Sequence, residues 1–325
     1  MDPLRWQSHR LRNLFQSAAL LAAMAALLGT LGWLLAGSLG VIVAGAGVAV
    51  IWVFSPAVSP KLALQMSGAS ALPRHAAPEL HEAVRELAAR AKLDPIPALH
   101  YVPGNAVNAF AFGDAQRSAL AVSDGLLRVL SRRELTGVLA HEISHIRNGD
   151  TWVLSLATRF SRITQTLSTA GLLLLILSIP LVLLGIDTFS IAAMLVLVLA
   201  PTLSGLLHLA LSRTREFDAD LGAVALTNDP AGLASALDKL ARIERSWLRR
   251  MLPFGRASAP ALLRTHPATG ERIRRLQALV GSQPMAIRGW TSRGDHAPPA
   301  SAVAMSDLAH YRPRRVRRAR AFAEQ

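Results

Sequence analysis

The chain has 325 residues, of which 51% are hydrophobic and 17% are charged, with a net charge of +14 and a mean hydropathy of +0.33. Soluble domains carry about 25% charged residues. The apolar residues are concentrated in three runs, 13–60, 163–186 and 188–212, that contain no Asp, Glu, Lys or Arg. This pattern excludes a soluble or disordered protein and predicts an integral membrane protein. The absence of Cys excludes disulfides, thiol nucleophiles and Cys-ligated metals.

The apolar runs predict four transmembrane helices arranged as two hairpins. A single helix over residues 13–60 would be roughly 72 Å long, but the hydrocarbon core is only about 30 Å thick. The first run is therefore expected to cross twice, at 14–35 and 39–58, with a break at the small residues between them. The second pair is expected at 164–184 and 190–211. A cleaved signal peptide has an apolar region of about 7–15 residues, which is far shorter than this first run.

Basic residues predict the orientation of these spans. Arg5, Arg10 and Arg12 precede the first span, Lys61 and Arg74 follow the second, and the two short turns within the hairpins contain neither Lys nor Arg. By the positive-inside rule, both termini and the segments outside the hairpins are expected in the cytoplasm. We therefore expect a multi-pass protein of the cell inner (plasma) membrane.

The C-terminal segment, residues 281–325, is expected to be a basic, disordered tail. Its arginines are crowded near the end of the chain, at Arg312, Arg314, Arg315, Arg317, Arg318 and Arg320. Such clusters can attract anionic lipid. No nucleic-acid motif accompanies the charge, so nucleic-acid binding is not expected.

The remaining residues are expected to form one compact domain. Segments 59–160 and 212–280 are together long enough for a core of their own. An amphipathic helix is predicted at 78–92, followed by short strands at 99–102, 108–112 and 119–122. Ser131 followed by Glu134 predicts a capping box that opens a helix running through His145.

That last helix contains the sequence His141-Glu142-Ile143-Ser144-His145. Residues i and i+4 lie on one helical face, so the two imidazoles can bind one metal ion together. Glu142 can reach a metal-activated water as general base. An exposed helix with incidental histidines is the alternative, but the apolar neighbours predict a buried helix, where unpartnered His and Glu side chains would be costly.

A catalytic zinc ion requires a third protein ligand. The candidates in the rest of the chain are His208, Glu216, Asp218, Asp220 and His266. Glu216 and Asp220 are four apart on a helix predicted at 213–226, so that Glu216 can bind the metal while Asp220 accepts a hydrogen bond from a ligand histidine. A solvated charged face is the alternative for this pair, and His208 is expected to be a packing residue at the membrane end.

The ordered motifs resemble those of the HtpX-type membrane zinc proteases, gluzincins related to the CAAX prenyl proteases. The resemblance covers about residues 5–280 and rests on five segments in family order, with a membrane hairpin between the His pair and Glu216: 108–111, 120–127, 141–150, 212–220, and 265–267 with 272–273. Asp218 stands where relatives often carry His, and the tail has no counterpart in the family core.

The resemblance implies one zinc ion per chain on His141, His145 and Glu216, with Glu142 as base. It also implies that His266 and Arg272 lie near the transition-state oxyanion, and that Asn108, Ala109 and Phe110 belong to an edge strand that pairs with extended peptide substrate. Edge pairing tolerates many sequences, which suits quality control of damaged membrane proteins under stress.

The expected architecture is therefore α+β and mainly helical. It comprises a transmembrane hairpin at 1–58, a cytoplasmic gluzincin metalloprotease domain with a small β-sheet at 59–280, interrupted by a second hairpin at 164–211, and the tail at 281–325. The expected activity is that of a zinc endopeptidase. The alternatives are a CAAX-type prenyl-protein protease and a catalytically silent membrane scaffold or lipid-binding protein.

Overall fold

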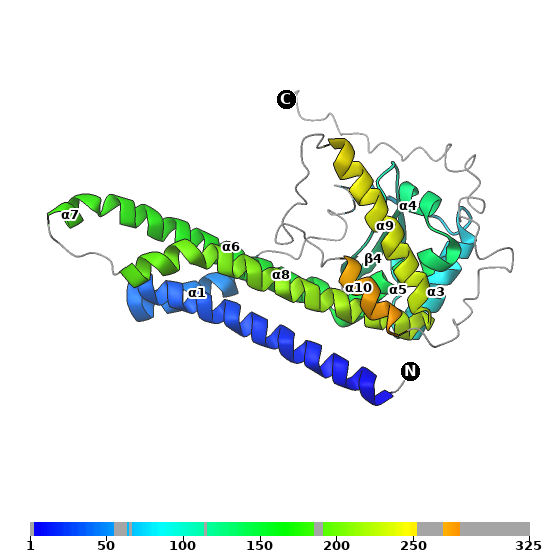
Figure 1. The fold of residues 1–325 in the computed structure, drawn as a ribbon, viewed down its shortest axis with the longest axis horizontal. Helices are drawn as coiled ribbons and strands as arrows, with labels where there is room; N and C mark the ends of the chain where they lie inside the picture. The colour runs from blue at the N-terminus through cyan, green and yellow to red at the C-terminus, as the bar shows by residue number, and fades with distance from the viewer. Residues whose placement is uncertain are drawn as a thin grey trace, which may run out of the picture.

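The structure is a computed structural model that describes residues 3–54, 64, 67–113, 116–184, 191–251 and 269–279. It consists of a long bundle of helices α1 (Pro3–Phe54), α6 (Asp150–Leu177) and α8 (Ile191–Thr227), with a rounded part at one end of the bundle (Figure 1). The rounded part contains the sheet and most of the remaining helices. The basic tail predicted at 281–325, the turn at 185–188 and His266 all lie outside the described residues.

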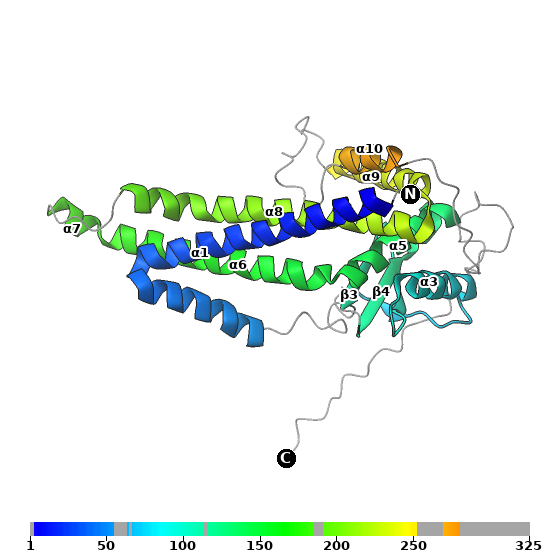
Figure 2. The ribbon, with the colours of Figure 1, turned by 90° about the horizontal axis from the view of Figure 1, so that it is seen from below.

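Three helices among the described residues are long and apolar enough to cross a membrane, over Leu11–Val50, Asp150–Leu177 and Ala193–Thr227. The first helix is broken at Ala36 and Gly37, whose backbone angles are not helical. Figure 2 shows that α1 turns back at this break, and Gly32 and Gly40 meet so closely that a Cβ at Gly32 would lie 2.5 Å from the Gly40 carbonyl oxygen. The predicted break is confirmed, whereas the count of four spans remains a prediction.

No helix end marks the expected boundary between the second hairpin and the soluble domain. The span predicted at 190–211 and the helix predicted at 213–226 form one continuous helix, α8. Likewise, α6 begins at Asp150 rather than near residue 164, and a short helix α7 (Ile179–Leu183) follows it. Nothing between Leu211 and Arg213 can stop a helix, because the segment contains neither Pro nor Gly. Helices α6 and α8 thus each extend without interruption from their apolar segments into the rounded part.

One proline is accommodated inside α8. Pro201 has no N–H, so the carbonyl of Leu197, four residues earlier, loses its helical donor. The buried Ser168 of α6 donates its hydroxyl hydrogen bond to that carbonyl. A neighbouring helix therefore satisfies the backbone group that Pro201 frees, as a water-free membrane interior requires.

The described residues form a sheet of four strands in the order β1-β2-β4-β3. They are β1 (Ser70–Ala71), β2 (Ala98–Val102), β3 (Ala109–Gly113) and β4 (Ser118–Ser123). β2 runs parallel to β4, whereas β3 runs antiparallel to it, with Ala109 opposite Val122 and Ala111 opposite Leu120. The three predicted strands are confirmed and the two-residue β1 was missed. Within the described part of the chain, β3 has a partner strand on one side only, so it forms an edge of this sheet.

Helices surround a core built on this sheet. They are α3 (Pro78–Ala91), α4 (Asp124–Val129), α5 (Arg132–Asn148), α9 (Pro230–Met251) and α10 (Thr269–Gln277). The predicted apolar face of α3 is buried, as is the face of α5 that carries Leu139 and Ile143. The predicted capping box is present, with Ser131 accepting from the Glu134 N–H while Glu134 accepts from the Ser131 N–H. These local signals fix where α5 begins and which way it faces.

Asp229 fixes the start of α9 against α5. Its carboxylate accepts from the Gly232 N–H at 2.9 Å and from two guanidinium nitrogens of Arg133, each at 2.6 Å. Burial tends to raise the pKa of Asp229, but the Arg133 and Gly232 hydrogen bonds outweigh it and hold the pKa below its ordinary value of 3.8. The carboxylate therefore stabilises the fold above that value, and the stabilisation is lost as pH falls through the depressed pKa.

We expect Asp229→Ala to lower the free energy of unfolding by about 1–2 kcal/mol near pH 7, as for other lost helix caps. The difference from wild type should begin to shrink below about pH 4, where Asp229 becomes protonated in the unfolded chain, and should be lost as pH falls through its depressed pKa in the folded protein. Thermal unfolding in detergent across this pH range measures both effects. Asp238→Ala, which removes an exposed ion pair with Arg242 on the same helix, should change stability by less than about 1 kcal/mol. An equal loss for Asp229→Ala at pH 7 and pH 3 would contradict this account.

Candidate metal centre

Helix α5 brings His141 and His145 together on one face. Their Nε2 atoms are 3.1 Å apart, and the rings meet edge to face with centroids 4.6 Å apart. His141 is buried and His145 is nearly so. Gly149 ends the helix in a left-handed conformation (φ 68°), which places the following residue, Asp150, beside the turn that carries His145.

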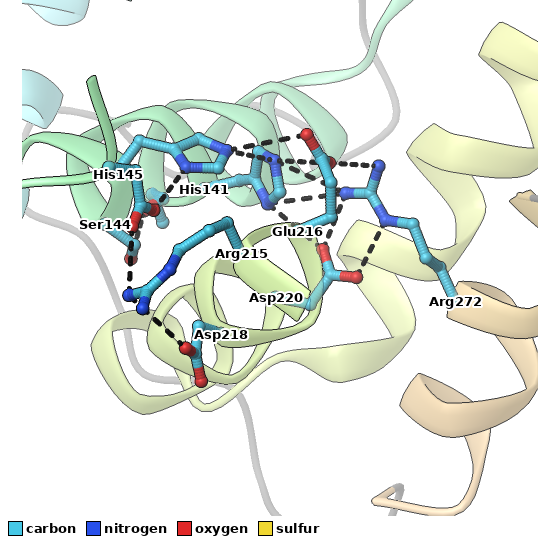
Figure 3. Close-up of polar contacts among 10 residues, drawn as sticks. His141, Ser144, His145, Arg215, Glu216, Asp218, Asp220 and Arg272 are labelled. Atoms are coloured by element: carbon cyan, nitrogen blue, oxygen red, sulfur yellow. Dashed lines mark hydrogen bonds and ion pairs between the residues drawn. The ribbon is translucent and has the colours of Figure 1, made fainter. Parts of the chain in front are cut away.

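Glu216 reaches the two histidines from α8. Its carboxylate oxygens lie 3.5 Å from His141 Nε2 and 3.9 Å from His145 Nε2. The helices can approach this closely because Gly222 faces α5, where an added Cβ would lie 2.6 Å from Ser144 Oγ. Figure 3 shows Glu216 directed toward the histidine pair. Glu216 was selected from sequence as the third ligand, and the structure brings it to the pair.

The three side chains fit a zinc ion. Zinc–nitrogen and zinc–oxygen bonds of about 2.0–2.2 Å in a tetrahedral arrangement place ligand atoms about 3.3–3.6 Å apart. The observed separations of 3.1, 3.5 and 3.9 Å bracket that range. Two imidazoles and a carboxylate are a donor set that zinc favours in catalytic sites. Among the residues that the structure describes, these three form the group of His and acidic side chains able to hold a metal.

A carboxylate contacts the far nitrogen of each histidine. Asp220 Oδ1 lies 3.0 Å from His141 Nδ1, and Asp150 Oδ2 lies 2.6 Å from His145 Nδ1. Such contacts set the tautomer, because a proton on Nδ1 leaves Nε2 free to bind a metal. Asp220 was expected beside a ligand histidine, but Asp150 was missed. Its position directly after the glycine that ends α5 was only a partial signal, because the contact also depends on how α6 packs.

Arg272 of α10 lies among these carboxylates. Its Nη1 is 2.8 Å from Glu216 Oε2, and its Nε and Nη2 donate to Asp220 at 2.8 and 2.7 Å. Its Nη2 is also 3.4 Å from the His141 ring nitrogens. Carboxylates hold the pKa of this buried guanidinium above its ordinary value despite burial. The structure thus places Arg272 at the centre, in contact with both Glu216 and Asp220 (Figure 3).

The charges of the site shift the pKa of its titratable groups. Burial and the Arg272 charge lower the pKa of His141, but hydrogen bonds to Asp220 and Glu216 outweigh them and raise it to about 9. Burial raises the pKa of Glu142, and the nearby His141 and His145 offset this only in part. A buried carboxyl with a raised pKa is suited to accepting and returning a proton.

Strand β3 lies beside Glu142. The Ala111 N–H donates a hydrogen bond to the Glu142 carboxylate. Asn108, just before the strand, is bonded to Ser123 of β4, since its carbonyl accepts from the Ser123 N–H and its N–H donates to Ser123 Oγ. Peptide groups alternate in direction along an antiparallel strand, so Ala109 and Ala111 direct theirs away from β4. These outward groups border the metal centre.

A cavity of about 510 Å³ connects these elements. Its lining includes the residues at 107–111 before and in β3, the pair His141 and Glu142, Glu216, and Arg272. On the opposite wall, α9 contributes Leu233, Leu237 and Leu240. The strand, the helix and the candidate ligands of this cavity were predicted from the sequence, but α9 was not identified as part of the lining. The cavity is large enough for several residues of an extended peptide.

The other candidate ligands have different surroundings. Asp218 accepts a hydrogen bond from Asn13 of α1 and lies near Arg215. His208 is part of α8 two turns before Glu216 and lies within the bundle region. Neither belongs to the metal-binding group of the described residues.

The sequence and structure are similar to those of known proteins. The model of peptidase family M48 matches residues 74–280. A "Protease HtpX homolog" of Methylibium petroleiphilum is 36% identical over 282 residues, which covers 82% of this chain and 98% of the relative. One from Burkholderia multivorans is 36% identical over 292 residues, with 82% and 97% covered. The crystal structure of S. mikatae Ste24p has a TM-score of 0.42 at 19% identity, covering 83% of this chain and 66% of that chain.

Proposed function

Because the chain belongs to peptidase family M48, and is thus a membrane-bound protease of a metallopeptidase family, we propose that it is a zinc endopeptidase that cleaves extended segments of membrane proteins. The observation that carries this proposal is the convergence of His141, His145 and Glu216 beside Glu142 in one cavity. The ligand distances support zinc as the metal. One ion per chain is expected, since the three side chains form a single group.

The mechanism follows from the positions of the side chains. Bound zinc would supply a Lewis acid that polarises the scissile carbonyl and makes water more acidic. Glu142 takes the proton of the attacking water and transfers it to the leaving amine, a role that its burial and raised pKa support. Asp220 and Asp150 keep the Nδ1 protons of the two histidines in place.

Positive charge and donors near the developing oxyanion complete the proposed site. Arg272 lines the cavity and contacts Glu216, so its charge acts within the reaction centre. His266, which lies outside the described residues, is proposed as a donor to the oxyanion by its place in the family motif. Preorganised donors at such a position can lower the barrier by several kcal/mol.

Substrate is proposed to bind as an added strand along β3. Two observations support this: β3 is an edge strand, and the outward peptide groups of Ala109 and Ala111 border the cavity. Pairing through the main chain tolerates varied sequences. Misfolded or damaged membrane proteins, which expose extended segments, are therefore the substrate class that this geometry favours.

The test is cleavage of casein, a disordered protein, by the detergent-purified chain with and without added Zn²⁺. We expect cleavage only with zinc bound, and removal of the ion by a chelator should abolish it reversibly. A farnesylated CAAX peptide serves as a second substrate. Cleavage of this peptide but not of casein would support the prenyl-protease alternative. Zinc-loaded protein that cleaves neither substrate would support the silent-scaffold alternative.

We also propose four spans in the inner membrane with the catalytic domain and both termini in the cytoplasm. The arginines before the first span and the break in α1 support this arrangement. Reporter fusions at Ser38 and Asp187 should then be detected outside the cytoplasm, and fusions at Gly113 and Gly255 inside. A cytoplasmic signal at Asp187 would mean that the second hairpin does not cross the membrane.

A further inference from the structure

A chain of buried polar contacts joins the first membrane helix to the metal centre. On α1, Asn13 is only 5% exposed, and its Nδ2 donates to Asp218 Oδ1 of α8 at 2.6 Å. The two residues are 205 positions apart in the sequence. A buried polar side chain on an apolar helix is costly unless it is bonded, so this contact fixes where α1 lies against α8.

Arg215 continues the chain toward the histidine pair. Its Nη1 lies 3.8 Å from Asp218 Oδ2 and 3.4 Å from Asp150 Oδ1 (Figure 3). Asp150 is 1% exposed, and its other oxygen contacts His145 Nδ1 at 2.6 Å. The contacts thus run from Asn13 through Asp218, Arg215 and Asp150 to His145. A small cavity of about 110 Å³, partly lined by Leu14, Arg215 and Asp218, lies at this junction.

The distances show that two carboxylates share one guanidinium. Arg215 is 5% exposed, and its Nη1 is almost as near to Asp218 as to Asp150. A buried carboxylate that loses one of its donors attracts a nearby cation more strongly, because a buried charge is costly when fewer groups compensate it. The Asn13 amide supplies Asp218 with a donor of its own. Arg215 can then remain with Asp150.

We propose that Asn13 is a positioning residue for the metal ligand His145: by bonding Asp218, it keeps Arg215 on Asp150, which in turn orients the imidazole. This inference rests on the proposed function, since it concerns the same metal centre. It also means that the position of α1 in the membrane is coupled to metal binding. The catalytic domain is then not independent of its first membrane helix.

The competing interpretation is that Asn13 and Asp218 only pack α1 against α8. The two interpretations differ in one combination of substitutions. If Asp218 attracts Arg215 when Asn13 is lost, then neutralising Asp218 should remove the attraction and restore the site. If the pair only holds the helices together, loss of Asn13 should lower stability without changing zinc affinity, so the double variant would have no lost affinity to restore.

The experiment measures Zn²⁺ affinity of the full-length protein in detergent by competition with a chelator. Asn13→Leu, which keeps the number and branching of the side-chain heavy atoms and suits an apolar helix, should weaken zinc binding by roughly 3- to 30-fold. Asn13→Leu with Asp218→Asn should return the affinity to within about twofold of wild type. Ser17→Ala should leave it unchanged, since the Ser17 hydroxyl is buried on the same helix and, among the described residues, donates to the backbone carbonyl of Asn13.

Bound Co²⁺ gives a second measurement that does not depend on activity. Its visible absorption reports ligand geometry, so Asn13→Leu should alter the spectrum and the double variant should restore it. Wild-type affinity in Asn13→Leu, or no recovery in the double variant, would overturn the inference while leaving the proposed function intact. His145→Ala provides the reference for a lost site. If the wild-type protein binds zinc no more tightly than this variant, both the inference and the proposed function are overturned. Asn13→Ala provides an independent variant if the Leu form is not folded.

Discussion

Replacement of Glu142 by Gln is expected to leave one zinc ion bound per chain and to reduce peptide cleavage by about 10²- to 10⁴-fold. Gln has the shape of Glu but cannot accept the water proton, and Glu142 is not among the side chains that form the metal-binding group. Metal analysis of the purified variant and its rate of casein cleavage measure the two effects separately.

Removal of a ligand should differ from Glu142→Gln in one respect, because zinc should be lost together with cleavage. His141→Ala, His145→Ala and Glu216→Ala each leave two protein donors, so each should lose zinc as well as cleavage. His208→Ala is the matched control, because His208 is on α8 with Glu216 but is not part of the metal-binding group of the described residues. Retention of stoichiometric zinc by Glu216→Ala, together with its loss from His208→Ala, would show that the third ligand was chosen wrongly.

The parts of this site that depend on nearby residues were predictable from the sequence. His141 and His145 are one helical turn apart, and Ser131 with Glu134 fixes the start of their helix, so both the pair and its helix followed from local rules. The small residues at 36–40 indicated the break in α1, which the structure places at Ala36 and Gly37. Alternation and turn residues located three of the four strands.

The parts that depend on packing between distant segments were not predictable. Asp150 lies only five residues from His145, but its contact requires the left-handed turn at Gly149 and the packing of α6. Asn13 and Asp218 are brought together only because α1 lies along α8. Arg272 was named from the family motif, yet its pairing with Glu216 and Asp220 depends on where α10 packs. No local periodicity encodes such contacts.

Helix α8 is continuous, although the sequence-based prediction divided it into a membrane span at 190–211 and a separate helix at 213–226. Hydropathy separates an apolar segment from a charged one, whereas a helix continues until a residue stops it. Glu216 and Asp220 therefore lie on the same rigid helix as the apolar segment near Pro201. The proposed metal ligand Glu216 thus lies on a helix that is long and apolar enough to cross a membrane, which agrees with the expectation that α1, packed on α8, can influence the site.

Ala111→Pro is expected to reduce cleavage by about 10- to 100-fold while zinc remains bound. The Ala111 N–H faces away from β4 and donates to Glu142. Proline has no N–H, so the variant loses a donor to a charged group, worth about 1.5–3 kcal/mol, and places a ring on the edge proposed to bind substrate. The β3–β4 pairing should persist, because edge strands tolerate Pro where the N–H points outward.

Ala111→Val is the matched control for that substitution. It enlarges the same side chain and retains the N–H, so its cleavage rate should stay much closer to wild type than that of Ala111→Pro. Zinc content and thermal unfolding of both variants establish that the centre and the sheet are intact. Equal losses in Ala111→Pro and Ala111→Val would indicate a steric effect of the side chain, and normal cleavage by Ala111→Pro would exclude a role for this peptide group. A large loss confined to the proline variant is the result expected if this peptide group takes part in cleavage, because the two variants differ chiefly in the outward N–H and its hydrogen bond to Glu142.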